Sequence, residues 1–330
     1  EGDSVTGGSG KEILNPNAGS SVTVKANNPK AGTDTVIVSP NEKVVIDGET
    51  YVTGANGATL TVDENGNVTI TDGSVKLARN EKIVANGSTI ENVGNAEIEV
   101  DKDGTITAPT PGSEVKINDV TYKTAENDTV INATADGSKL TKGAVELDRD
   151  ETIKVGEGNT SVKNNGDVTI TVRANADGSG EADVPANGNV TIGDNTYTTG
   201  TDGAKFDVDK NGNVTMREGS VDFGNGNSVT GGSGKVIQNP NDGSTITVKA
   251  NNPVNGTDTV IVSPNEKVVI DGKTYVAGAS GATLAVDEAG NVTLTDNSIK
   301  LARNEKIIAN GNTIENVGNA EIEVDKDGVI

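Results

Sequence analysis

Short runs in which apolar and polar residues alternate recur along the whole chain. Clear examples are residues 21–25, 34–38, 96–100 and 167–172, which are rich in valine, isoleucine and threonine. Successive side chains of a β-strand point to opposite faces, so this alternation predicts strands with one buried face. No stretch carries a helical apolar period of useful length, and no apolar run approaches the ~18 residues of a membrane-spanning helix. The pattern therefore predicts an all-β protein.

Turn-forming pairs separate the predicted strands. Asparagine, aspartate and glycine tolerate the positive φ that tight turns require. Asp47-Gly48, Asn65-Gly66 and Asn211-Gly212 each stand between two alternating runs. These pairs predict two-residue hairpin turns.

The chain contains a long internal repeat. Residues 3–106 return as residues 227–330 at a constant offset of 224, and 85 of the 104 aligned positions are identical without a gap. Apolar changes are conservative, as in Val22 to Ile246, whereas the turn residue Glu49 becomes Lys273. The core is retained while the surface varies, which favours a protein whose function depends on its shape.

A shorter repeat lies inside the long one. The four tyrosines each end a variant of one hexapeptide, and their spacings of 71, 75 and 78 residues together make the long period. A large apolar residue follows each tyrosine by nine positions, and a proline precedes each by eleven or twelve. We expect the tyrosines, both phenylalanines and the single methionine to pack in the core. The tyrosines are Tyr51, Tyr122, Tyr197 and Tyr275, the apolar residues Leu60, Ile131, Phe206 and Leu284, and the prolines Pro40, Pro111, Pro185 and Pro264.

This register divides the chain into repeat units. The predicted units are residues 1–76, 77–147, 148–222 and 223–300, of which the last is the long-period copy of the first, and residues 301–330 start a fifth. The sequence begins without methionine and both ends fall inside a repeat, so we expect a segment of a longer protein.

Two architectures fit these units. In a β-solenoid the chain coils in steps of roughly 20 to 30 residues and stacks equivalent strands in parallel ladders. In the alternative, each unit is a small antiparallel β-sandwich and the domains follow in tandem. A unit with one tyrosine and a mostly aliphatic core is poorly stable alone, whereas a solenoid shares its core with its neighbours. We therefore expect an elongated repeat protein of the β-solenoid, or β-helix-like, type.

Composition excludes several kinds of chemistry. The chain has no histidine and no cysteine, so Ser-His-Asp and Cys-His catalysis, thiolate metal sites and disulfides cannot be built. Residues 6–11 are glycine-rich and end in a lysine, but they lack the spacing of a phosphate loop and are predicted to form a structural turn. Paired carboxylates can cleave polysaccharides, yet no local break in the repeat marks such a site. We expect neither enzymatic activity nor a cofactor.

The charge narrows the range of partners. With 49 acidic and 27 basic residues the formal net charge is −22, and such a surface repels nucleic acid and anionic lipid. Acidic faces also oppose lateral pairing of exposed strand edges. We expect no nucleic-acid partner and no membrane insertion by this segment.

One segment resembles a calcium-binding loop. Asp207, Asp209 and Asn211, with Glu218 further on, match the spacing of an EF-hand loop of about twelve residues. The flanking sequences are not helical, however, and the copies of this segment place Thr61 or Ala285 at the position of Asp207. We therefore interpret it as a β-turn and keep these four residues as a weak calcium candidate.

The chain resembles the repeat regions of large bacterial cell-surface adhesins and extracellular fibre proteins. The resemblance is carried by the phrases at residues 66–77, Gly-Asn-Val-Thr-Ile-Thr-Asp-Gly-Ser-Val-Lys-Leu, and 46–51, Ile-Asp-Gly-Glu-Thr-Tyr. It implies an extracellular or cell-surface location and a structural stalk or filament that serves adhesion or biofilm, with self-association into fibres. The alternatives are a repeat-borne module that binds a glycan or a host or cell-surface protein, and a carboxylate-based polysaccharide-active enzyme.

Overall fold

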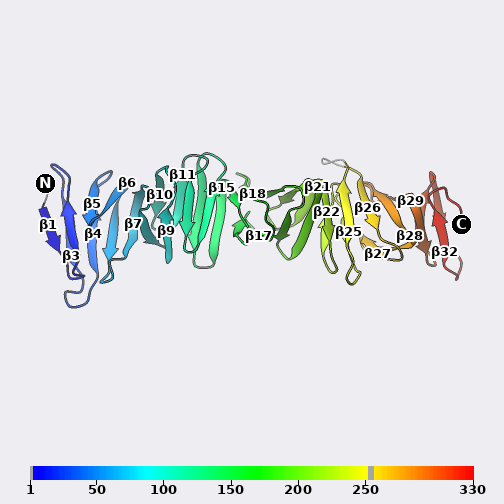
Figure 1. The fold of residues 1–330 in the computed structure, drawn as a ribbon, viewed down its shortest axis with the longest axis horizontal. Coiled ribbons are helices and arrows are strands. Elements are labelled where there is room, and N and C mark those ends of the chain that lie inside the picture. The colour runs from blue at the N-terminus through cyan, green and yellow to red at the C-terminus, as the bar shows by residue number, and fades with distance from the viewer. Residues whose placement is uncertain (1–2, 252–255) are drawn as a thin grey trace. The chain divides into compact units, whose positions relative to one another are not determined.

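The computed structural model describes residues 3–251 and 256–330 (Figure 1). Within these ranges the regular structure consists of 32 β-strands without a helix, which confirms the all-β prediction. The described residues accordingly hold no helix that is long and apolar enough to cross a membrane. Residues 1–2 and 252–255, which belong to the first and fourth predicted repeat units, lie outside the described part.

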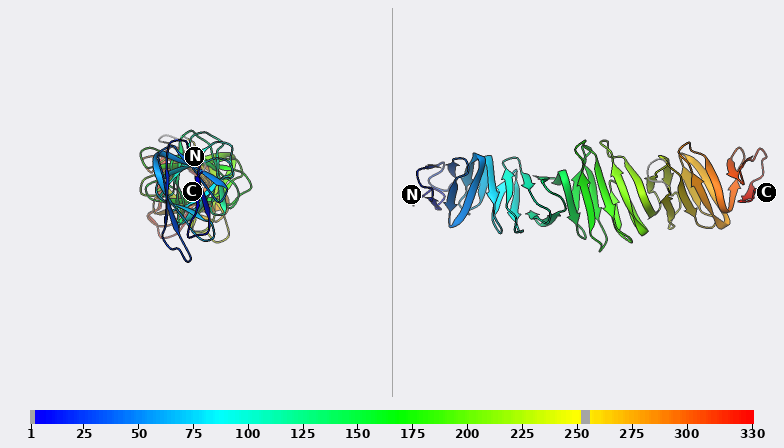
Figure 2. Two further views of the ribbon diagram at one scale, coloured as in Figure 1. Left: turned by 90° about the vertical axis from the view of Figure 1, so that its left-hand side faces the viewer. Right: turned by 90° about the horizontal axis from the view of Figure 1, so that it is seen from above.

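The described chain forms two compact units, each considered by itself. The first comprises the residues up to Glu146 together with Arg173–Ala176. Its strands follow one another in sequence order, as the colour gradient shows (Figures 1 and 2). They are β1 (Asp3–Thr6), β2 (Glu12–Asn15), β3 (Val22–Ala26), β4 (Asp34–Val38), β5 (Lys43–Ile46), β6 (Glu49–Val62), β7 (Val68–Leu77), β8 (Lys82–Ala85), β9 (Ser88–Asn92), β10 (Ile98–Asp101), β11 (Thr105–Ala108), β12 (Glu114–Ile117), β13 (Val120–Thr124), β14 (Thr129–Thr134) and β15 (Gly137–Leu147), the last of which ends at the boundary.

The second unit comprises Leu147–Val172 and the chain from Asp177 onward. Its strands are β16 (Thr152–Val155), β17 (Thr160–Asn164), β18 (Ile170–Ala174), which crosses the boundary, β19 (Gly180–Val184), β20 (Asn189–Ile192), β21 (Asn195–Val208), β22 (Val214–Phe223), β23 (Ser228–Thr230), β24 (Val236–Gln238), β25 (Ile246–Ala250), β26 (Asp258–Val262), β27 (Lys267–Ile270), β28 (Lys273–Val286), β29 (Val292–Leu301), β30 (Lys306–Ala309), β31 (Asn312–Glu315) and β32 (Ile322–Asp325).

Long hairpins such as β6–β7 connect two series of antiparallel ladders. The first residues of β6 pair with β5 and its last residues pair with β4, while β7 pairs with both parts. The register shifts between Thr53 and Ala58, where the strand passes from one series to the other. Gly73 has a φ of 75° at this shift, a backbone conformation that glycine and asparagine tolerate, and Asn297 takes its place in the same register of the copy β28–β29. The hairpins β21–β22 and β28–β29 repeat this arrangement in the second unit.

The strand pairing differs from the parallel ladders expected for a solenoid. Among the described pairs whose register is defined, the parallel ones are the short contacts β7–β8, β22–β23 and β29–β30, and the others are antiparallel. Tight turns reverse the chain at nearly every step, which favours antiparallel neighbours. Neither are the tyrosine-containing repeats separate sandwiches, because β7–β10, β22–β25 and β29–β32 pair strands of consecutive repeats.

The turns bear out one of the three predicted two-residue connections. Asp47 and Gly48 have φ of 49° and 89° and directly join the pair Ile46–Glu49, as in a type I′ turn. The other two predictions were wrong in length, because each connection has five residues. Residues 63–67 join β6 to β7, and residues 209–213 join β21 to β22.

The five-residue turn depends on different positions than predicted. The N–H of Gly66 donates to the carbonyl of Asp63 at 3.0 Å, and Gly66 has a φ of 84°. The Asp63 carboxylate accepts the N–H groups of Asn65 and Asn67 at 2.9 and 2.8 Å. The turn therefore needs its aspartate and glycine, which explains why Ala289 can stand at the position of Asn65 in the long-period copy.

The core is aliphatic with a few aromatic side chains, as predicted. The four tyrosines are at most 7 % exposed, and Phe206, Phe223 and Met216 are at most 1 % exposed. The rings of Tyr197 and Phe206 stack with centroids 5.1 Å apart. Because both come from β21, from the two parts of the strand on either side of its register shift, the contact fixes the bend of the long hairpin.

Candidate functional site

A buried asparagine follows each long hairpin and joins it to the next strands. Asn92, Asn164 and Asn239 have no exposed surface, and Asn316 is 3 % exposed. Asparagine is rarely buried unless its amide is fully hydrogen-bonded. Because four asparagines are buried at equivalent places, we interpret them as parts of a repeated structural junction.

The contacts of Asn92 define this junction. Its Nδ2 donates to the carbonyl of Leu77 at 2.8 Å and to that of Ala96 at 2.7 Å, while its Oδ1 accepts the N–H of Gly94 at 3.0 Å. Leu77 is the last residue of β7, and Ala96 lies just before β10. One side chain thus satisfies three backbone groups and links the end of a hairpin to the strand that pairs with it.

The other junctions repeat the same bonds. Each asparagine donates to the carbonyl of the last hairpin residue, which is Leu147, Phe223 or Leu301, at 2.9 to 3.0 Å. Each also donates to a carbonyl four or five residues downstream, that of Val168, Ser244 or Ala320, at 2.7 to 2.8 Å. The backbone N–H two residues downstream donates to Oδ1 in every case, at 2.9 to 3.0 Å.

Sequence reasoning missed these asparagines. They stand 15, 17, 16 and 15 residues after the last hairpin residue, so the spacing varies and the chain is rich in asparagine. The usable signal was the glycine or asparagine two positions further on, whose N–H binds Oδ1. Only the folded chain shows which asparagine is buried.

A buried threonine holds the turn beside the repeated proline in the first three repeats. Thr53 Oγ1 donates to the carbonyl of Ser39 at 2.6 Å and accepts the N–H of Glu42 at 3.1 Å. Thr124 and Thr199, which also stand two residues after a tyrosine, donate to the carbonyls of the equivalent turns. In the fourth repeat Ala277 stands at this place and is fully buried.

The glycine-rich segment at residues 6–11 is a turn around a buried carboxylate. Asp34 is fully buried, and its oxygens accept the N–H of Gly8 at 2.9 Å and the N–H and hydroxyl of Ser9 at 3.1 and 2.7 Å. A Cβ at Gly7 would lie 1.7 Å from Asp34 Oδ2. Backbone N–H groups of such turns favour an anion, and here the anion is part of the protein itself. In the long-period copy, burial raises the pKa of the equivalent carboxyl, Asp258.

The structure separates the four residues of the calcium candidate. Asp207 lies in β21 with Oδ1 3.0 Å from Arg217 Nη1, and Glu218 in β22 forms an ion pair with Lys205 at 3.3 Å. Over residues 3–251 and 256–330, no group of three or more Asp, Glu, His or Cys side chains is placed to hold a metal ion.

Asp209 and Asn211 lie together in the turn between β21 and β22. Asp209 Oδ1 accepts the N–H groups of Asn211 and Asn213, each at 2.8 Å, and Oδ2 accepts Asn213 Nδ2 at 2.7 Å. These hydrogen bonds, led by that of the Asn213 side chain, lower the pKa of Asp209. The carboxylate is occupied by its own turn, and the same turn occurs at Asp63 and Asp287.

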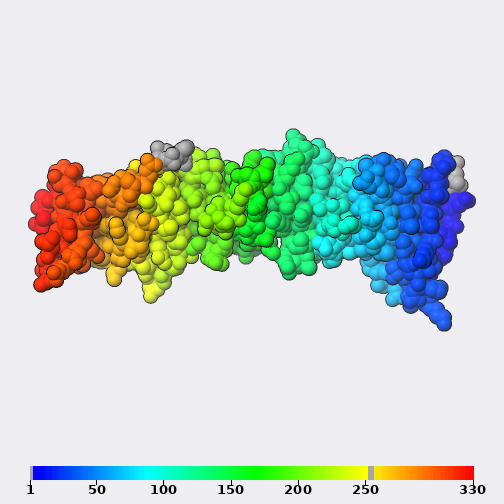
Figure 3. Space-filling model, turned by 180° about the vertical axis from the view of Figure 1, so that it is seen from behind, coloured from blue at the N-terminus to red at the C-terminus, as the bar shows by residue number. Residues whose placement is uncertain are grey.

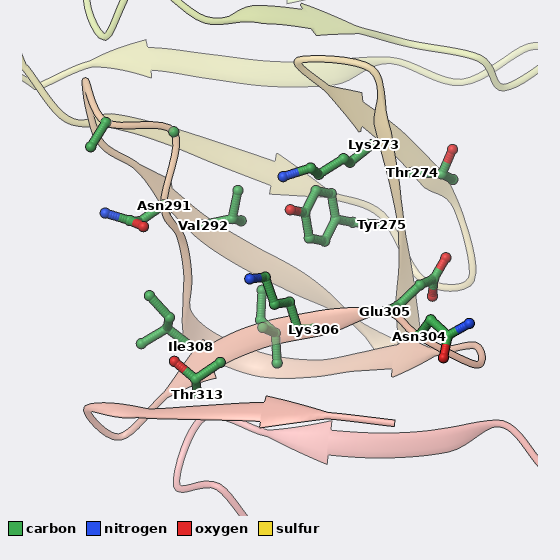
Figure 4. Close-up of a pocket in the computed structure, with 13 residues that line it drawn as sticks. Lys273, Thr274, Tyr275, Asn291, Val292, Asn304, Glu305, Lys306, Ile308 and Thr313 are labelled. Carbon is green, nitrogen blue, oxygen red and sulfur yellow. The ribbon is translucent and has the colours of Figure 1, made fainter. Parts of the chain in front are cut away.

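A cavity of about 460 Å³ lies beside Tyr275, between the start of β28, the β28–β29 turn and β30. Figure 4 shows the Tyr275 hydroxyl and the amino groups of Lys273 and Lys306 pointing into this cavity, on the side of Asn291. Burial and, to a smaller extent, the charge of Glu305 raise the pKa of Tyr275. A hydroxyl, an amide and two ammonium groups can hold a small polar or anionic group.

The equivalent places in other repeats are different. Beside Tyr51 the cavity measures about 110 Å³, and Glu49 stands where the copy has Lys273. Burial, then the charges of Glu49 and Glu81, raise the pKa of Tyr51 to about 12. Beside Tyr197 the hydroxyl donates to the carbonyl of Ser228 at 2.7 Å. The cavity is therefore not a feature that all repeats share.

Comparisons with protein-family models, curated proteins and solved structures find no match.

Proposed function

We propose that this chain is a structural segment, a stalk or filament, of a repetitive extracellular bacterial surface protein, and that it supplies length and stiffness for adhesion or biofilm. The observation that carries the proposal is the junction between consecutive repeats. At the junctions within each unit, an antiparallel ladder and a buried asparagine join the two repeats, as β7 and β10 are joined near Asn92 and β22 and β25 near Asn239. Such junctions leave no flexible linker between the repeats that they connect.

The physical properties of the chain agree with this role. In a protein of stacked repeats, stability is the sum of repeat and nearest-neighbour terms, so the stack can be extended without a larger core. The formal charge of −22 keeps a long β-structure solvated and opposes lateral aggregation. As in a β-solenoid, consecutive repeats share strand ladders in this proposal. The ladders are antiparallel rather than parallel.

Small-angle X-ray scattering tests the proposal. Chains lengthened by one or two 224-residue periods are expected to gain equal increments in maximum dimension. A chain with a flexible glycine-serine segment in place of residues 224–250 is the control, because the replacement removes Asn239 and β25 and with them the junction. A maximum dimension that grows only as about the square root of length, as in a string of loosely linked domains, would contradict the proposed stiffness.

The cavity beside Tyr275 favours a second candidate function, the binding of an acidic glycan. Lys273 and Lys306 supply positive charge next to the hydroxyl. Isothermal titration with a uronic acid oligosaccharide, with a neutral oligosaccharide as comparison, measures it. The matched control is Lys273→Glu, which restores the residue of the first repeat. Equal binding by both chains would exclude this cavity as the site.

A further inference from the structure

The two long-period copies of one strand have different neighbours. In the second unit, β25 pairs with β26 on one edge and with β22 on the other. Its first copy, β3, pairs with β4 in the same register that β25 takes with β26. Among the described residues, the other edge of β3 has no partner strand. Figure 1 shows β1 and β3 at one end of the first unit, which is the dark blue end in Figure 3.

The missing neighbour changes the exposure of identical or similar side chains. Ile246 and Val248 are fully buried in β25, whereas Val22 and Val24, at the same positions of β3, are only half-buried. Val229 in β23 is 1 % exposed, and its copy Val5 in β1 is 46 % exposed. The first copy thus provides an apolar face that no strand of the described residues covers.

The hydrogen bonds of the junction asparagine also differ between the two copies. Asn239 donates one amide hydrogen to the carbonyl of Ser244 and the other to that of Phe223, the last residue of β22. Its copy, Asn15, donates to the carbonyl of Ser20 at 2.9 Å and accepts the N–H of Asn17 at 3.0 Å. In the described structure, no carbonyl takes the place of Phe223 beside Asn15. The second amide hydrogen of Asn15 can therefore donate to the carbonyl at the end of an added strand.

We propose that the free edge of β3 binds a strand of the β22 type from another copy of this repeat. The register is the one that β22 takes on β25, in which the residue equivalent to Phe223 lies opposite Val22 and the residue equivalent to Gly219 lies opposite Ala26. The carbonyl at the end of that strand accepts the second amide hydrogen of Asn15. This pairing is an interaction between repeats, and it holds whether or not the chain is extracellular.

Polar side chains of β3 are suited to the same partner. Thr247 donates to Asp222 at 2.6 Å, and Lys249 lies 3.8 Å from Asp202. Thr23 and Lys25 occupy these two positions in β3. An incoming repeat with aspartates at the positions of Asp222 and Asp202 therefore finds its hydroxyl and ammonium partners in place, whereas a strand without them does not.

Hydrogen exchange on an extended chain tests this proposal. Residues 147–226 are joined directly in front of Asp3, which keeps the 224-residue offset and supplies a β22-type strand. We expect amide exchange in β3 to slow at least about tenfold, whereas exchange in β4 and β25, already paired on both edges, stays unchanged. A glycine-serine extension of the same length is the control and leaves β3 as it was.

Two further variants make the result decisive. A longer extension with residues 77–226 supports the added hairpin with its own preceding repeat. In the extended chain, Asn15→Ala is expected to make amide exchange in β3 faster again in part, because it removes the hydrogen bond from Asn15 to the carbonyl at the end of the added strand. Unchanged exchange in β3 with both extensions would overturn the proposal, and so would equal protection by the glycine-serine extension. Neither result bears on stiffness, which the scattering experiment measures separately.

Discussion

Replacement of Asn92 is expected to weaken the junction between the first two repeats far more than an ordinary surface substitution. Asn92→Ala removes the partners of three backbone groups, the carbonyls of Leu77 and Ala96 and the N–H of Gly94. Each buried group left unpaired costs about 1 kcal/mol or more. The junction should therefore lose about 3 kcal/mol.

Asn92→Asp tests the same contacts with almost no change of shape. The carboxylate can still accept the N–H of Gly94, but it faces the carbonyls of Leu77 and Ala96 without a hydrogen to donate. Burial and these carbonyls raise the pKa of the new carboxyl in the folded state. The folded state therefore retains its proton more readily than the unfolded state. Stability is present below the unfolded pKa of about 3.9 and is lost as the pH rises through the folded pKa.

Native-state hydrogen exchange of β10, with urea unfolding followed by circular dichroism, measures both variants. The matched control is Asn95→Asp, because Asn95 is exposed and its Oδ1 accepts a hydrogen bond from Arg79. This control should stay within about 0.5 kcal/mol of the unmodified chain. If Asn92→Ala costs less than about 1 kcal/mol, or if Asn92→Asp is no more stable at pH 4 than at pH 7, the reasoning about the junction is refuted.

Three further predictions concern other repeated features. Ala277→Thr should stabilise the fourth repeat by about 1 kcal/mol in urea unfolding, because it restores the hydroxyl that Thr53 uses in the first repeat; a destabilised variant would contradict this. Because the chain has four tyrosines and no tryptophan, ultraviolet titration should show Tyr51 ionising near its raised pKa of about 12. The stability that the neutral Tyr51 side chain contributes should be lost as the pH rises from about 10 through that value. Ionisation of all four tyrosines near pH 10 would contradict this prediction. A chelator should leave the melting temperature unchanged, because turn N–H groups already occupy Asp209; a fall of several degrees would restore a structural calcium site.

The strands were predictable because their physics is local. Alternation at residues 34–38 and the pair Asp47-Gly48 each determine their conformation within a few residues, and the structure has both as expected. Pairing direction was not predictable in the same way. It depends on which edges meet between β7 and β10 or between β22 and β25, more than twenty residues apart. The solenoid expectation rested on the small aliphatic core of each unit, which favours a core shared between units but allows either pairing direction.

The candidate site residues also differ in whether local sequence or long-range contacts determine their place. The reading of Asp209 and Asn211 as a turn agrees with the structure because the copies of the segment showed which positions can vary. Asn92 could not be identified from the sequence, because its burial depends on carbonyl acceptors that only the folded junction brings within reach. An asparagine that is exposed, such as Asn95, lies three residues away.

Cysteine cross-linking tests the central claim, antiparallel pairing of consecutive repeats, most directly, because the chain has no cysteine of its own. Ser220 in β22 lies opposite Lys249 in β25, so the pair Ser220→Cys and Lys249→Cys should form a disulfide on oxidation. The pair Ser220→Cys and Thr247→Cys, shifted by two residues along the same face, should form little. Equal cross-linking of both pairs, or efficient cross-linking of the shifted pair alone, would contradict the register on which the account rests.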